Sequence, residues 1–105
     1  MDPVLLSLIA LLGSLTYIGV AIIKILFLCF NEIKKIFLRF GKSVRITRND
    51  VRFISQEVNS EKCTHIYGIF DTCTGTVKAH EFISAKKVDN EVQQELNETG
   101  TILLT

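Results

Sequence analysis

Apolar residues follow one another almost without interruption from Val4 to Phe30. The stretch Val4–Ile23 carries no charged residue, and a hydrocarbon core about 30 Å thick requires about 20 residues of helix. A secretory signal peptide is disfavoured, because no basic segment precedes the run and no small-residue cleavage site follows it. The pattern therefore predicts a transmembrane helix within residues 1–30, with Lys24 at its inner boundary.

A stripe of mostly small residues runs along this predicted helix. Its members recur at spacings of three and four, and they lie on or beside one helix face: Ser7, Ala10, Gly13, Ser14, Tyr17 and Ala21. Small residues let two helices approach closely, which favours helix packing in lipid. We therefore expect this stripe to contact other membrane protein subunits or a second copy of the chain.

The pattern becomes two-sided after the membrane segment. Over residues 31–42 large apolar side chains fall on one side of a helix, and most of the charged residues fall on the other. A basic amphipathic helix of this kind is typical of a bilayer surface, where its cations contact anionic headgroups: Lys34, Lys35, Arg39 and Lys42. We expect this juxtamembrane helix to end at Gly41. The alternative is that its apolar side packs on the rest of the chain.

The distribution of charge predicts an orientation, although the formal net charge of the 105 residues is only +1. Residues 31–58 contain seven basic and three acidic residues, whereas residues 59–105 contain four basic and seven acidic ones. Basic flanks stay on the cytoplasmic side of a membrane. The prediction is a single-pass protein of the plasma or inner membrane, with its N-terminus outside and its C-terminal domain in the cytoplasm. Three cysteines, an odd number, fit a reducing compartment.

The region after the juxtamembrane helix begins with an ambiguous pattern. A short strand is expected at Ser43–Ile46. Thr47 followed three residues later by Asp50 resembles a capping box, which predicts a helix over Arg48–Val58. In the alternative, Asn49 and Asp50 turn a hairpin and the residues after them form a strand, so the sequence leaves residues 47–58 open between helix and strand.

The clearest local signal is a β-hairpin over Cys63–Ser84. Two β-rich runs flank a loop in which Asp71 can bond turn amides and Gly75 can take a left-handed conformation. Pairing of Asp71 with Thr76 sets a register that leaves one face of mixed aromatic, basic and apolar character. We expect part of that face to bind a partner: His65, Tyr67, Lys78, His80 and Phe82.

The C-terminal pattern completes a small α+β domain over residues 43–105. An acidic amphipathic helix is predicted at Lys87–Glu98, stopped by Gly100, and a strand at Thr101–Thr105. The expected order is strand, helix, strand, strand, helix, strand, which is the ferredoxin-like βαββαβ arrangement. The alternative is an antiparallel β-meander with one helix.

Candidate chemistry is sparse. Cys63, His65 and His80 share the predicted hairpin face and are types that bind zinc, but a structural site needs four ligands. No catalytic motif, cofactor motif or nucleic-acid signature accompanies them, so we expect neither an enzyme nor a cofactor. The favoured function is a non-enzymatic accessory or assembly subunit of a larger membrane complex. The alternative is a membrane-anchored metal- or ligand-binding module that uses the open face of residues 63–84.

Overall fold

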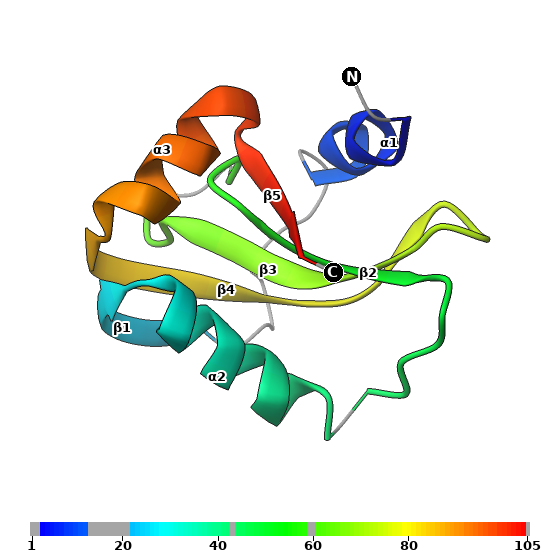
Figure 1. The fold of residues 1–105 in the computed structure, drawn as a ribbon, viewed down its shortest axis with the longest axis horizontal. Coiled ribbons are helices and arrows are strands. Elements are labelled where there is room, and N and C mark those ends of the chain that lie inside the picture. The colour runs from blue at the N-terminus through cyan, green and yellow to red at the C-terminus, as the bar shows by residue number, and fades with distance from the viewer. Residues whose placement is uncertain (1–2, 13–21, 43, 59–60, 105) are drawn as a thin grey trace.

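The structure, a computed structural model, describes residues 3–12, 22–42, 44–58 and 61–104. The strands form one mixed sheet in the order β1-β4-β3-β2-β5, in which β1 runs parallel to β4 and the other neighbours are antiparallel. Figure 1 shows the elements, which follow one another as α1 (Pro3–Leu12), β1 (Ile22–Leu28), α2 (Phe30–Phe40), β2 (Asp50–Ser55), β3 (His65–Asp71), β4 (Thr76–Val88), α3 (Asn90–Thr99) and β5 (Thr101–Leu104).

The predicted transmembrane helix is wrong. α1 has 10 residues, which at about 1.5 Å per residue give half the thickness of a hydrocarbon core. The end of the apolar run, Ile22–Leu28, is a strand of the sheet. Among the described residues no helix is long and apolar enough to cross a membrane. The single-pass topology and the membrane localisation that the hydropathy pattern predicted are therefore wrong.

The reason for the error lies in what β1 pairs with. β1 is hydrogen-bonded in parallel to β4, from Ile22 opposite Phe82 to Leu28 opposite Val88. A short apolar run in a strand has the same hydropathy as part of a membrane helix, so hydropathy alone does not separate the two, and in this edge strand only Ile25 and Leu28 are buried. The isoleucines of this stretch, β-branched and stiff at χ1, favour the strand.

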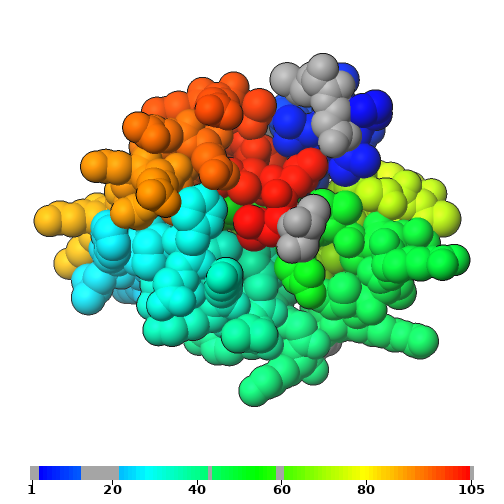
Figure 2. All heavy atoms as spheres, viewed as in Figure 1, coloured from blue at the N-terminus to red at the C-terminus, as the bar shows by residue number. Residues whose placement is uncertain are grey.

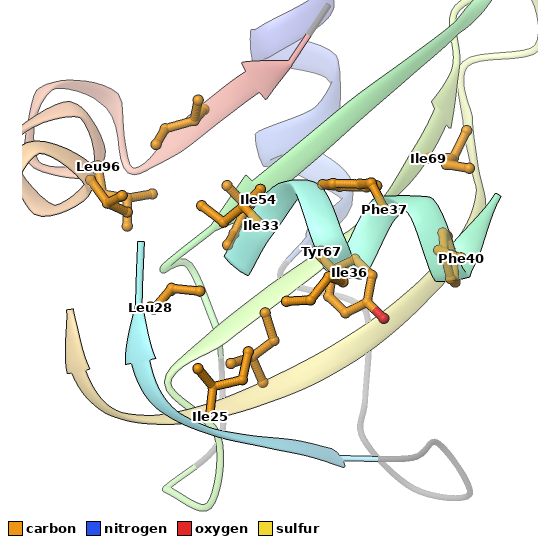
Figure 3. Close-up of a cluster of buried hydrophobic side chains, with 13 residues drawn as sticks. Ile25, Leu28, Ile33, Ile36, Phe37, Phe40, Ile54, Tyr67, Ile69 and Leu96 are labelled. Carbon is orange, nitrogen blue, oxygen red and sulfur yellow. The ribbon is translucent and has the colours of Figure 1, made fainter. Parts of the chain in front are cut away.

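The helix predicted for residues 31–42 exists, but its apolar side is covered by the sheet. α2 ends at the predicted cap, Gly41. Figure 3 shows four of its side chains pointing onto the sheet, where they are buried: Ile33, Ile36, Phe37 and Phe40. The alternative in which this side packs on the rest of the chain is therefore the observed one, and the apolar side is not available to a bilayer.

The ambiguous segment is a strand. Val44–Ile46 is irregular, and the helix expected over Arg48–Val58 is replaced by β2, which pairs with β3 and β5. Asp50 accepts a hydrogen bond from the backbone N–H of Thr47 at 2.7 Å, while its own N–H donates to the Thr47 carbonyl oxygen. One half of the capping-box pairing, the bond from the Thr47 N–H to the Asp50 carboxylate, therefore closes a turn that leads into β2 instead of starting a helix.

The C-terminal part follows the prediction at the hairpin turn and at Gly100, but the predicted start of the helix at Lys87 is wrong, because β4 continues to Val88 and α3 begins at Asn90. Asp71 pairs with Thr76, and its carboxylate accepts from the turn amides, as expected for the hairpin. α3 ends at Gly100, which is left-handed with φ of 81°, and β5 follows. The ferredoxin-like order is nevertheless wrong, because β2, β3 and β4 are three successive strands and β1 adds a fifth, parallel one. Over the predicted domain the alternative is the nearer one, because β2, β3 and β4 form an antiparallel meander followed by one helix, α3. It omits β1 and α2, which lie outside the predicted domain yet complete the sheet and its cover.

The sheet has two covered faces, named here for the helices that lie on them. On the α2/α3 face, the helix residues pack with sheet residues such as Ile54, Tyr67 and Ile83. On the α1 face, Leu8 and Leu12 pack with residues that alternate with those: Phe53, Ile66, Phe70 and Phe82. The domain is therefore a helix–sheet–helix sandwich (Figure 1).

Candidate interaction surfaces

The hairpin face expected to bind a partner is divided between the two faces of the sheet. Ile69 pairs with Ala79 but Phe70 pairs with Val77, so Lys78 is an extra residue in β4. Such a bulge reverses the alternation of every side chain beyond it. His80 and Phe82 consequently share the α1 face, whereas His65 and Tyr67 lie on the α2/α3 face.

Gly68 lies opposite His80 beside this bulge. A Cβ at Gly68 would overlap the Ala79 carbonyl oxygen and lie 3.0 Å from the His80 Cα. Only glycine permits this close approach of the two strands. The glycine was therefore a sequence signal for an irregular pairing within the hairpin.

Tyr67 is buried rather than available to a ligand. Its ring meets the rings of Phe37 and Phe40 edge-on, with centroids 5.4 and 5.2 Å away. Burial, followed by the charge and hydrogen bond of Glu81, raises the pKa of the Tyr67 phenol well above its usual range, and the Arg39 charge opposes this only in part. Tyr67 is therefore a neutral core residue that anchors α2.

The two histidines do not form a site together. His65 is buried, its Nδ1 lies 2.7 Å from the Thr64 hydroxyl, and burial lowers the pKa of its imidazole to about 4. His80 is half-buried on the other face, where its ring meets Phe82 edge-on at 5.7 Å. Burial also lowers the pKa of His80, against the opposing charge of Glu81. Both imidazoles are thus kept neutral near pH 7.

The metal hypothesis finds no cluster in the described part of the chain. Cys63 is buried on the α1 face with Phe82, away from the face that His65 occupies. Within residues 3–12, 22–42, 44–58 and 61–104, no group of three or more histidine, cysteine, aspartate or glutamate side chains could hold a metal ion.

Lys78, the bulged residue, holds a loop. Its ammonium donates to the Arg45 carbonyl oxygen at 2.6 Å and to the Asp50 carboxylate at 2.9 Å. The Thr47 N–H, followed by the hydrogen bond and charge of Lys78, lowers the pKa of the Asp50 carboxyl, although desolvation opposes this. These contacts hold residues 45–50 against β4, and they engage the Lys78 ammonium within the chain instead of leaving it for a partner.

The small-residue stripe also has a different place from the one expected. Ser7 and Ala10 lie on the exposed side of α1, and the helix packs on the sheet through leucines instead. Gly13, Ser14, Tyr17 and Ala21 lie outside the described residues. The basic residues predicted to contact headgroups, Lys34, Lys35, Arg39 and Lys42, are all exposed.

An exposed apolar strand edge is the surface that sequence analysis missed. β1 is an outermost strand of the sheet, and Leu26 and Phe27 are 73% and 48% exposed. Beside them, a groove of about 500 Å³ runs between β1 and α2 and is lined by Lys24, Glu32 and Arg39 among others. The available signal was the run of apolar residues itself, which was assigned wholly to a bilayer.

A second hollow lies between α2 and strands β2 and β5. It holds about 320 Å³ and is lined by apolar residues with two cations: Phe30, Ile33, Phe37, Leu38, Leu104, Lys34 and Arg52. Figure 2 shows this side of the molecule, where β5 (red) lies between α2 (cyan) and α3 (orange).

Comparison with family models, curated proteins and solved structures finds no match to this chain. Its function is therefore argued from its surfaces alone.

Proposed function

We propose that the chain is a non-enzymatic assembly subunit that binds another protein along the open edge of β1. The single observation that supports this is the pair of apolar side chains, Leu26 and Phe27, exposed on an outermost strand. Exposed apolar edges promote pairing with another chain.

The edge of β1 carries little protection against such pairing. Among the described strands β1 pairs only with β4, and the Asp89 N–H after β4 donates to the Leu28 carbonyl oxygen, so the other side of β1 presents backbone N–H and C=O groups. Proteins usually block such edges with charges, prolines or bulges. The strand contains one charged residue, Lys24, and no proline. An extended segment of a partner would satisfy these groups and cover Leu26, as in recognition by strand addition.

The charged residues of the groove beside β1 favour partner segments that carry complementary charges. Glu32 and Arg39 lie seven residues apart on α2 and both line it, so the groove carries both signs of charge. A second copy in antiparallel orientation would bring Glu32 of each copy towards Arg39 of the other, which makes the surface self-complementary. A strand from a different protein would need the same pattern of charges.

The test uses the full chain and two matched substitutions. Leu26→Lys places a charge on the edge, whereas Leu38→Lys does so at a leucine of nearly equal exposure, 71%, away from β1. We expect the unmodified chain to associate, with itself in sedimentation or with a co-purifying subunit, and to gain hydrogen-exchange protection in β1. Leu26→Lys should abolish both signals, and Leu38→Lys should leave them intact.

Two results would contradict the proposal. One is a chain that sediments as a monomer and co-purifies with nothing from its own source. The other is equal loss of association in the two lysine variants, because that would place the interface elsewhere or reflect a general effect of charge.

A further inference from the structure

We propose that the hollow between α2 and β5 binds an amphiphile that has an alkyl chain and a carboxylate head. This site lies away from the β1 edge and does not depend on the proposed assembly function.

The walls of the hollow fit an alkyl chain. It is lined by Ile33 and Phe37, which are buried residues of α2, and by Leu38 and Leu104. Its volume of about 320 Å³ is at the lower end of the range of small-molecule pockets. Leu38 is 71% exposed and thus offers apolar area that a ligand would remove from water.

Two cationic side chains line this apolar hollow and favour a ligand with an anionic head group. Lys34 extends from α2 and Arg52 from β2, where Arg52 pairs with Leu104 of β5. Among the residues that the structure describes, no acidic side chain lines the hollow and neither cation has an ion pair: Lys35 pairs with Glu32, and Lys78 with Asp50. Guanidinium groups bind carboxylates by two parallel hydrogen bonds. The charge left unmatched is therefore positive, and a monoanionic head complements it.

The experiment titrates the ¹⁵N-labelled full chain with decanoate below its micelle concentration and follows amide chemical shifts. n-Decanol, which has the same chain without the charge, is titrated in parallel. We expect saturable decanoate shifts confined to α2, β2 and β5, and weaker binding of the alcohol. Arg52→Gln and Lys34→Gln should each raise the Kd about fivefold, the effect of losing one partly exposed ion pair.

The matched control is Lys86→Gln, which removes the same charge on β4 outside this hollow. It should leave the Kd unchanged, and unaltered spectra of the three variants without ligand would show that each is folded. Three results would overturn the proposal. These are the absence of saturable shifts, equal binding of decanoate and decanol, and pocket shifts that depend on protein concentration without ligand. The last would mean that a second copy covers the hollow.

Discussion

The two faces of the sheet are covered by unequal amounts of helix. On the α2/α3 face, two helices of 11 and 10 residues cover Ile54, Tyr67 and Ile83 of the sheet. On the α1 face, the described cover is a single helix of 10 residues that packs through Leu8 and Leu12. Burial of apolar area is the main source of stability, so the difference suggests that the fold is held chiefly from the α2/α3 side.

The helices on the two faces also differ in how they are linked to the strands of the sheet. α2 and α3 each lie between two strands of the sheet in the chain, so we expect that neither can leave without disturbing its neighbours. α1 precedes the first strand and has no strand before it in the described chain. Elements of this kind open locally at a lower free energy than the core does.

Leu96→Ala should have the largest effect. Leu96 is fully buried between α3 and the sheet, and deletion of such a side chain leaves a cavity that closes poorly. We expect a loss of about 4 kcal/mol in the free energy of unfolding, measured by urea denaturation. Leu38→Ala, at an exposed leucine, is the control and should change it by less than about 0.5 kcal/mol. A loss below about 1 kcal/mol for Leu96→Ala would refute the primacy of the α2/α3 face.

The pH dependence of stability tests the same face through His65. Its pKa is about 4 in the folded chain and about 6.5 in the unfolded one, so the unfolded state takes up the proton first as the pH falls. The contribution of His65 to the free energy of unfolding should be fully present above about pH 6.5. It should fall by about 3 kcal/mol between pH 6.5 and 4, because one pKa unit is worth about 1.4 kcal/mol. Below pH 4 this loss should stop.

The variant His65→Gln isolates that contribution. It should flatten the fall in stability measured by urea denaturation at a series of pH values. His80→Gln is the matched variant, and because the pKa of His80 is also lowered it should remove a further part of the slope in the same direction. Asp50, whose carboxyl pKa is lowered, loses its contribution only as the pH falls through a value below 3.8, outside this window. If the pH dependence of the free energy of unfolding were unchanged in His65→Gln, its attribution to His65 would be wrong.

Leu8→Ala should destabilise the fold less than Leu96→Ala does. Leu8 is as fully buried as Leu96, but α1 can detach without unfolding the sheet. The cost is therefore limited to the free energy with which α1 docks, and we expect about 2 kcal/mol. Hydrogen exchange should show loss of protection in Pro3–Leu12 with the sheet unchanged. Equal global losses for Leu8→Ala and Leu96→Ala would mean that the two faces are equivalent.

Local chemistry explains which elements could be predicted. The hairpin and α3 carry their own boundary signals, namely the carboxylate of Asp71 at the turn and the left-handed glycine after α3. These signals act over a few residues, so they work without knowledge of the fold. The same holds for Gly41 at the end of α2.

The errors arose where a distant partner decides the structure. β1 is a strand because β4 pairs with it, and β2 is a strand because β3 and β5 enclose it, although Thr47 and Asp50 carry a helix-capping pattern. The bulge at Lys78 reversed the assignment of the hairpin faces, and with it the candidate binding residues. The exposed β1 edge and the α2/β5 hollow are products of tertiary packing, which no local pattern contains.

The parallel pairing of β1 with β4 has a consequence for how the chain is made. Ile22 pairs with Phe82, so a ribosome adds sixty further residues before the partner strand exists. At about 5 to 20 residues per second, β1 waits for roughly 3 to 12 s as an unpaired apolar segment. Pairings at such separation also form late, because loop closure costs entropy before the contact returns it. The strand with the most exposed apolar edge is therefore also the one that depends longest on protection during synthesis.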